Sequence, residues 1–177
     1  MSESTLNKRL YTDLNRLKLC NKADAEVRFL CEKTPFDNDD DDDDDNMSGD
    51  AAKATEYSVI GQIFPNSEIY KIAAYRIEMK LPKTFPLVPP QVRFLTPIYH
   101  PNIEEKGDFC NDLLVKTAKW LPTTSLIDIV KIVVKHVDEP DADNPVRAAL
   151  GVEYKTNRPE FDRHALEYVK KHGLSRS

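Results

Sequence analysis

Residues 96–120 read TPIYHPNIEEKGDFCNDLLVKTAKW, and the rest of the chain is arranged around this stretch. It follows neither a helical nor a strand period for long. Prolines lie within it and on both sides of it: Pro82, Pro86, Pro89, Pro90, Pro97, Pro101 and Pro122. Prolines at this density exclude a continuous helix or a central strand. Irregular segments of this length are usually functional or disordered, and Tyr99, Phe109 and Trp120 make this one too apolar to remain unpacked. We therefore expect the stretch to fold against a core and to present Cys110.

The length and composition indicate one domain with a hydrophobic core of its own. The chain has 177 residues, of which 40% are hydrophobic, and this is enough for a core without disulfide bonds. Its three cysteines are odd in number and irregular in spacing, unlike a disulfide framework. No apolar run approaches the roughly 18 residues of a membrane-spanning helix, and the first residues lack the apolar core of a signal peptide. We expect a monomer in a reducing cytoplasmic or nuclear setting, with no membrane partner.

The net charge of −5 is concentrated in one segment. Nine of the thirty acidic residues lie between Asp37 and Asp50, where there is no lysine or arginine, so the rest of the chain carries +4. A mildly basic domain suits an acidic protein partner. A nucleic-acid-binding protein would need a denser stripe of basic residues with aromatic residues among them, so we expect no nucleic-acid partner.

The acidic segment is predicted to be an insert in a single domain that spans residues 1–177. Seven consecutive aspartates stand in it, at 39–45. Such a run repels itself and cannot bury enough apolar surface to order, which predicts a disordered loop over about 36–54, between the first and second strands. Two roles stay open: a solubilising tether, or a competitor that covers the basic surface against an acidic partner.

Hydrophobic periodicity predicts an N-terminal helix followed by four strands. Leucines recur at helical spacing between residues 4 and 19, at Leu6, Leu10, Leu14 and Leu17. Apolar alternation predicts strands at 25–31, 56–64, 74–81 and 91–95. Sequential strands with short connections favour an antiparallel meander, for which one covered face is enough.

Three helices are predicted after the irregular stretch. Thr124 or Ser125 can cap a central helix that runs to about residue 137. Its inner side is predicted to consist of Leu126, Ile129, Ile132, Val133 and Val137. Two further helices are predicted over 147–154 and 159–172, the second with Pro159 at an allowed first-turn position. The order of helix, four strands, loop and three helices belongs to the α+β class.

Two interpretations of Cys110 stay open on the residues alone. It is either a packed structural thiol, since free cysteines are often buried, or a nucleophile. A cysteine hydrolase would need an activating histidine, for which His100 is the nearest in sequence. Asp108 and Asp112 disfavour the thiolate, so the thiol suits exchange with an already activated thioester better than attack on an amide. His100 and Cys110 lack the paired spacing of a zinc site, and we expect no metal.

Three short motifs carry a family resemblance. They are His100-Pro101-Asn102, Gly107-Asp108-Phe109-Cys110 and Trp120-Leu121-Pro122, set after the proline-rich strand entry Phe85–Pro90. In this order and spacing they resemble the ubiquitin-conjugating enzymes, over nearly the whole chain apart from the acidic insert. Residues 98–107 and 144–155 look most like the branch that serves HECT and RING-between-RING ligases. The resemblance implies the ubiquitin-conjugating fold: an N-terminal helix, an antiparallel meander, an active-site loop, a central helix and two C-terminal helices.

The resemblance also implies roles for the loop residues. Cys110 matches the cysteine that accepts ubiquitin as a thioester from the activating enzyme and passes it on. Asn102 matches a side-chain amide near that cysteine, which either stabilises the developing oxyanion or braces the loop through backbone hydrogen bonds. His100 is expected to fix the shape of the loop, and Pro101 to set its turn.

The acceptor preference implied by the resemblance depends on two positions. A lysine amine is protonated at neutral pH, so transfer to lysine needs acidic or polar residues that desolvate and orient it, whereas a ligase thiol needs less help. Asp112 matches an acidic position of lysine-reactive members, and Asn144 stands where those members carry a second acid. With one acid kept and one lost, we expect normal loading, ready transfer to thiols and slow transfer to free lysine.

The resemblance implies a surface for the ligase and the activating enzyme that combines the first helix, the loop after the proline-rich strand entry and the loop after the tryptophan. The matching positions are Lys8, Arg9, Leu87, Pro122 and Thr123. Leu87 stands where the closest branch has an aromatic anchor, which is often an energetic hot spot, and Thr123 replaces a small alanine. The expected partners are ubiquitin, its activating enzyme and HECT, RING-between-RING or RING ligases.

Two alternatives to a ubiquitin-conjugating enzyme remain. One is conjugation of a different ubiquitin-like modifier, which uses the same chemistry with different docking. The other is a scaffold that binds ubiquitin or a ligase without chemistry, against which the presence of Cys110 and Asn102 argues. No bound cofactor is expected, because ATP is consumed by the upstream activating enzyme and the chain has no phosphate-cradling glycine loop.

Overall fold

The apolar patterning described above produces an α+β domain, seen in a computed structural model that describes residues 3–22, 25–37, 56–110, 112, 114 and 120–176. The acidic insert predicted over 36–54 lies outside the described residues, apart from 36 and 37. The elements in chain order are α1 (Glu3–Leu19), β1 (Phe29–Lys33), β2 (Glu56–Ile63), the 3-10 turn η1 (Tyr70–Ile72), β3 (Tyr75–Pro82), β4 (Gln91–Phe94), α3 (Leu126–Asp138), α4 (Ala148–Thr156) and α5 (Arg158–His172). Both the fold class and the predicted order are confirmed.

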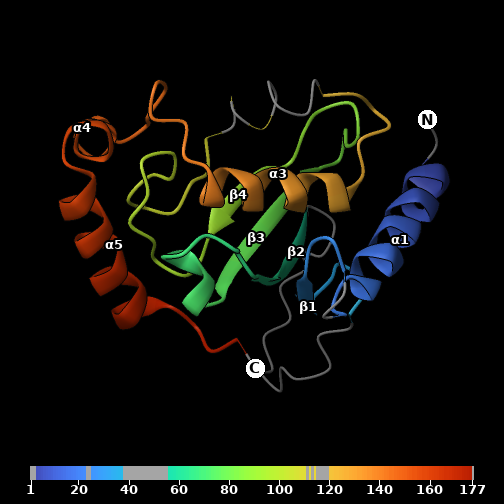
Figure 1. Ribbon diagram of the computed structural model, residues 1–177. Helices are drawn as coiled ribbons and strands as arrows, with labels where there is room; N and C mark the ends of the chain where they lie inside the picture. The colour runs from blue at the N-terminus through green and yellow to red at the C-terminus, as the bar shows by residue number, and fades with distance from the viewer. Residues whose placement is uncertain are drawn as a thin grey trace, which may run out of the picture.

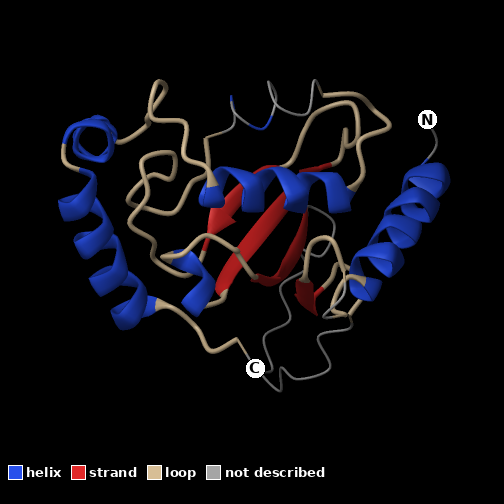
Figure 2. Ribbon diagram, viewed as in Figure 1, coloured by secondary structure: helices blue, strands red, loops and turns tan. Residues whose placement is uncertain are grey.

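The four strands form one antiparallel sheet in the order β1-β2-β3-β4, the predicted meander. The longest pairing joins β2 to β3, from Glu56 opposite Pro82 to Ile63 opposite Tyr75. Successive side chains of a strand point to opposite faces. Every second residue of β3 is therefore completely buried: Tyr75, Ile77, Met79 and Leu81. Helix α3 crosses the sheet in Figures 1 and 2 and covers this apolar face.

The first strand lies later in the chain than predicted. We expected it over 25–31, but it runs from Phe29 to Lys33. Val27 is buried and made the alternation look longer, yet it lies in a bend that leads into the sheet. The strand begins where the Phe29 N–H donates to the Cys20 carbonyl at 3.1 Å. The pairing with β2 shifts in register between Cys31 and Lys33. The polar residues there interrupt the apolar alternation, so the sequence does not show that the strand continues.

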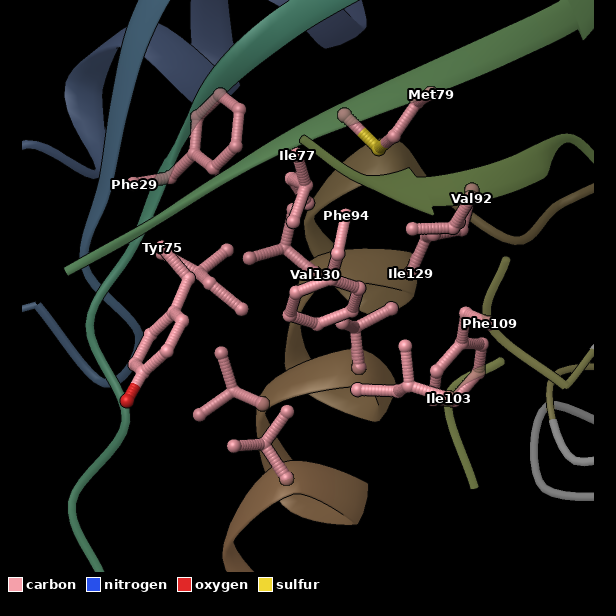
Figure 3. Close-up of a cluster of buried hydrophobic side chains, with 14 of the residues drawn as sticks. Phe29, Tyr75, Ile77, Met79, Val92, Phe94, Ile103, Phe109, Ile129 and Val130 are labelled. Carbon is pink, nitrogen blue, oxygen red and sulfur yellow. The ribbon is translucent and has the colours of Figure 1, made fainter. Parts of the chain in front are cut away.

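Helix α3 lies across the apolar face of the sheet and forms the centre of the core (Figure 3). Ser125 caps it, because its hydroxyl accepts from the Asp128 N–H at 3.2 Å while the Asp128 carboxylate accepts from the Ser125 N–H at 3.0 Å. Its buried residues are Leu126, Ile129, Val130, Val133, Val134 and Val137. Ile132, expected on the inner side, is only partly buried, because the 3.6-residue repeat places Val130 and Val134 on that side instead.

The remaining helices flank the sheet at its two ends (Figure 1). Helix α1 packs beside β1 and α3. Leu10, Leu14 and Leu17 of its predicted apolar side are buried, and the side chain of Leu6 lies outside the described part of the chain. Helices α4 and α5 lie at the opposite end, and the chain after α5 returns to pair Leu174 with Ala74. No helix within the described ranges is long and apolar enough to cross a membrane.

Candidate active site

The stretch after β4 folds back on itself and brings Cys110 beside Asn102. Isolated bridges pair Ile103 with Phe109 and Arg93 with Asp108, and the Cys110 N–H donates to the Asn102 carbonyl at 3.1 Å. Ile103 and Phe109 are buried against α3, so they anchor the loop in the core (Figure 3). The prediction that this irregular stretch packs against the core is confirmed for residues 96–110, while 111, 113 and 115–119 lie outside the described residues.

Gly107 makes the sharp turn between the two halves of the loop. Its φ of +97° lies in a region that side chains rarely allow, and a Cβ at this position would collide with the Phe94 carbonyl oxygen. Its own carbonyl accepts from the Phe94 N–H at 2.8 Å, which ties the turn to β4. After this turn the chain runs beside β4, where Asp108 pairs with Arg93, and then reaches Cys110.

Cys110 opens onto a groove of about 550 Å³. The thiol is free and half-buried. The lining residues are Gln91, Val92, Glu104, Asp108, Phe109, Cys110, Asp112 and Val146. The charged residues in this lining are all acidic: Glu104, Asp108 and Asp112. Within the described ranges no group of three or more His, Cys, Asp or Glu side chains could hold a metal ion.

Asn102 has its side-chain amide fully engaged in hydrogen bonds. The residue is completely buried. Its Nδ2 donates to the carbonyls of Asp141 at 2.8 Å and Asn144 at 3.2 Å, and its Oδ1 accepts from the Asp141 N–H at 2.8 Å. An amide has two donor hydrogens, and both are used here. Asn102 thus joins the cysteine loop to the turn formed by residues 141–144.

The turn over residues 141–144 is shaped by the Asp141 carboxylate. It accepts from the Asp143 N–H at 3.0 Å, the Asn144 N–H at 3.1 Å and the Asn144 side-chain amide at 3.0 Å. The side-chain hydrogen bond from Asn144 is the main cause of the lowered pKa of Asp141. The Asn144 side chain is exposed but bonded toward Asp141, and it is not part of the groove lining, whereas Asp112 is.

His100 and Pro101 hold the loop from beneath. His100 is completely buried, and its Nδ1 accepts from the Asn102 N–H at 3.1 Å. Burial lowers the pKa of His100 to about 3, so the imidazole is neutral at physiological pH. The Pro101 carbonyl accepts from the N–H groups of Val146 at 2.9 Å and Arg147 at 3.0 Å. These contacts are of the kind expected for loop-structuring residues.

The neutral state of His100 predicts how stability depends on pH. The unfolded chain binds a proton at this histidine below its ordinary pKa of about 6.5, whereas the folded state does so only near pH 3. The unfolded state therefore binds more protons in this window, and the free energy of unfolding falls as pH is lowered through it. Between pH 7.5 and 5.5 the expected loss from His100 is about 1.4 kcal/mol. His136, whose pKa burial also lowers, acts in the same direction.

Urea unfolding of the native chain and of His100→Asn at both pH values measures this effect. The variant is expected to lose about 1.4 kcal/mol less than the native chain over this interval. Equal losses in the two proteins would contradict a neutral, buried His100. His136 remains in both and serves as the internal control.

The residues predicted for partner docking gather at the end of the domain near α1. Leu87 is 61% exposed, and Pro122 and Thr123 are also exposed. The Trp120 indole N–H donates to the Pro86 carbonyl at 3.0 Å, which ties the two docking loops together. Helix α1 joins them, because Arg9 donates to the Thr124 carbonyl at 3.3 Å; Lys8 beside it is exposed.

Several residues of the site were not identified from the sequence. Glu104 and Val146 line the groove, and Asp141 orders the turn that Asn102 holds. Asp141 had a local signal, since Asp-Ala-Asp-Asn-Pro is rich in residues that cap their own turns. Val146 had none, because only the fold brings it beside Cys110.

Comparison with known proteins is consistent with this geometry. The sequence model of the family described as ubiquitin-conjugating enzyme matches residues 33–169. Ubiquitin-conjugating enzyme E2 T of Bos taurus is 34% identical over 110 residues, 61% of this chain and 56% of that protein. The Homo sapiens E2 T is 36% identical over 105 residues, 58% of this chain and 53% of that protein. This chain thus spans about half the length of these two relatives.

A shorter relative and a solved structure extend the likeness. Ubiquitin-conjugating enzyme E2-18 kDa of Drosophila melanogaster is 34% identical over 116 residues, 66% of this chain and 75% of that protein. A crystal structure from Plasmodium yoelii, described as a candidate ubiquitin conjugating enzyme, matches with a TM-score of 0.70. It covers 99% of this chain and 98% of that chain at 21% identity, which shows a common fold.

Proposed function

The chain belongs to the ubiquitin-conjugating enzyme family, and we propose that it accepts ubiquitin from the activating enzyme as a thioester on Cys110 and passes it to a ligase cysteine or a substrate lysine. The observation that carries this proposal is a free, half-buried thiol at the wall of a groove of about 550 Å³. A groove of this kind admits an extended peptide end beside the sulfur. The activity is therefore a transferase reaction with a covalent intermediate.

Loading transfers the ubiquitin acyl group from one cysteine thiol to another. The Cys110 sulfur attacks the carbonyl carbon of ubiquitin's terminal thioester, a new S–C bond forms, and the activating enzyme's cysteine leaves as a thiolate that takes up the proton Cys110 gave to solvent. Bond energy is nearly conserved in this exchange. ATP is spent earlier, by the activating enzyme, and we propose that this chain binds no cofactor.

We propose that Asn102 acts mainly by holding the 141–144 turn beside the groove. Its two amide hydrogens are both donated to carbonyls of that turn, at 2.8 and 3.2 Å. It could assist the oxyanion only by giving up one of these bonds during transfer.

The acceptor preference depends on which acids face the acceptor. Asp112 is exposed and lines the groove with Cys110, so it is placed to orient an incoming amine. Asn144 is bonded to Asp141 instead. With a single acid so placed, we propose rapid discharge to thiols and slow discharge to free lysine.

The Asn144→Asp variant tests this preference. An aspartate there would face the Asp141 carboxylate, to which the Asn144 amide now donates at 3.0 Å. Like charges repel at this distance, so the new carboxylate should turn away from Asp141. Discharge of the loaded thioester to free lysine is expected to rise on the order of 10-fold, with discharge to cysteine unchanged. A native chain that discharges to lysine as fast as to a cysteine ligase would refute the preference.

The surface predicted for docking suits the activating enzyme and a ligase, which would bind it one after the other. Leu87 is prominently exposed, and Leu121 beside the tryptophan is 57% exposed. With Lys8 and Arg9 on α1, this surface combines apolar contacts with positive charge. We propose HECT or RING-between-RING ligases as partners. Leu87 should bind them more weakly than an aromatic residue at the same position would. We also propose a reducing cytoplasmic or nuclear location, since the three cysteines are free.

One loading assay tests the proposed function against its alternatives. The chain is incubated with ATP, ubiquitin or another ubiquitin-like modifier, and the activating enzyme of that modifier. A band that forms with ubiquitin and disappears on treatment with a reducing agent is the expected result. A band with a different modifier alone would support the first alternative, and no band with any modifier would support a non-catalytic binding protein.

A further inference from the structure

Tyr99, which precedes the His100-Pro101-Asn102 motif, is fixed at both ends. Its backbone carbonyl accepts from the Tyr70 hydroxyl at 2.6 Å. Its own hydroxyl donates to Oε2 of Glu153 on α4, also at 2.6 Å. Burial, aided by the hydrogen bond to Glu153, raises the pKa of Tyr99 to about 12, so the phenol keeps the proton that it donates.

The Tyr99 ring lies against α5 and the residue that precedes α4. Its centroid is 5.5 Å from that of Phe161, 5.8 Å from His164 and 6.0 Å from Tyr168. The Arg147 guanidinium stands 5.7 Å from the same ring, while the Arg147 N–H donates to the Pro101 carbonyl. The C-terminal region therefore holds the loop at two points. Helix α5 packs against the ring of Tyr99, and Arg147 at the start of α4 binds the carbonyl of Pro101.

His164 holds the Glu153 carboxylate in place. Its Nδ1 lies 2.9 Å from Glu153 Oε1, and its Nε2 lies 2.9 Å from an Nη of Arg163. A carboxylate can only accept, so the proton of the hydrogen bond to Glu153 sits on His164 Nδ1. Nε2 also lies 3.3 Å from Oε1 of Glu160. Both carboxylate oxygens of Glu153 are thus bonded, one to His164 and one to Tyr99.

The Tyr99 segment leads directly to the reacting sulfur. Asn102 lies three residues further on, its side chain holds the 141–144 turn, and its carbonyl accepts from the Cys110 N–H. We propose that Glu153, supported by His164, is a positioning residue for ubiquitin transfer: through the Tyr99 hydroxyl it fixes the 99–102 segment and hence the placement of Cys110 and Asn102. This inference rests on the proposed function of Cys110.

The variants Tyr99→Phe, Glu153→Leu and their combination test the inference. Each is loaded with ubiquitin, and discharge to a thiol is followed over a range of thiol concentrations. A small displacement of reacting groups can cost orders of magnitude in rate, and we expect about a 10-fold lower maximal rate in each single variant. The half-saturating thiol concentration should not change. Because the same Tyr99–Glu153 hydrogen bond is lost in all three variants, the double variant should be no slower than the slower single variant.

Matched controls separate positioning from a general loss of packing. Glu153→Gln keeps an oxygen for Tyr99 and can donate its amide to His164 in the tautomer whose Nε2–H donates to Glu160, 3.3 Å away, so it should restore most of the rate. Tyr168→Phe removes a neighbouring hydroxyl that has no hydrogen bond with the described residues, and should discharge normally. Glu167→Leu removes a carboxylate that pairs with Arg163 on the same helix, and should also discharge normally.

Four results would overturn the inference. They are discharge by folded Glu153→Leu within twofold of the native rate, equal slowing by Glu167→Leu, no recovery in Glu153→Gln, and multiplicative effects in the double variant. A native chain that never loads would contradict the proposed function instead. In that case, hydrogen exchange of the Cys110 amide decides the inference, because it should be faster in Glu153→Leu and Tyr99→Phe than in Tyr168→Phe.

Discussion

Replacement of Cys110 by alanine is expected to abolish the covalent ubiquitin adduct, with no measurable residual loading. The thiol is the acceptor of the acyl group, and alanine offers no nucleophile in its place. Cys110 is only half-buried, so the variant should lose about 1 kcal/mol or less in free energy of unfolding and remain folded. Loss of loading would then report chemistry rather than misfolding.

Cys110→Ser sharpens this prediction. A serine at the same place can form an oxygen ester, more slowly because a hydroxyl is a weaker nucleophile than a thiol. The adduct should therefore survive a reducing agent that removes the native one. Cys20→Ser and Cys31→Ser are the controls, since burial raises the pKa of both thiols and neither lines the groove. Loading that persists in Cys110→Ala, or fails in the two control variants, would contradict the assignment.

Replacement of Asn102 by alanine is expected to slow transfer by about 100-fold, the second largest effect. The substitution leaves the Asp141 N–H and two carbonyls of the 141–144 turn without their buried partner. Unsatisfied buried groups also cost about 1–3 kcal/mol of stability each, so rates must be compared below the melting temperature of the variant. Single-turnover discharge of the loaded protein is the measurement.

Asp141→Ala separates the two actions open to Asn102. It removes the carboxylate that shapes the turn but leaves the Asn102 amide and its backbone partners in place. If Asn102 acts through the turn, Asp141→Ala should slow transfer on the order of 10-fold. A normal rate in Asp141→Ala, together with a slow Asn102→Ala, would instead assign Asn102 to the oxyanion.

Features set by short-range patterns could be predicted from the sequence. The apolar stripe of α1 and the alternation of β3 report burial directly, because each follows the period of its own element. The cap of α3 was predicted at Thr124 or Ser125, and the structure selects Ser125, whose partner Asp128 stands three residues later. The start of β1 was not, since Val27 is buried by a bend rather than by the sheet. Apolar character alone does not distinguish these two causes.

The chemistry of the site could be predicted only in part. Cys110 and its acidic neighbours lie in one short stretch of sequence, so their proximity could be predicted without knowledge of the fold. The partners of Asn102 lie 39 and 42 residues away, and those of Tyr99 include Glu153 at a separation of 54 residues. No local signal carries such contacts, because they arise from how α3, α4 and α5 are placed around the loop. The positioning role proposed for Glu153 follows only from that arrangement.

The most direct test of the central claim is the intact mass of the native chain after incubation with ubiquitin, its activating enzyme and ATP, measured without a reducing agent. We predict one added ubiquitin less one water, located at Cys110 by peptide mapping and lost on reduction. An unchanged mass while the activating enzyme is itself loaded, or a stable adduct on a lysine with Cys110 free, would contradict the account.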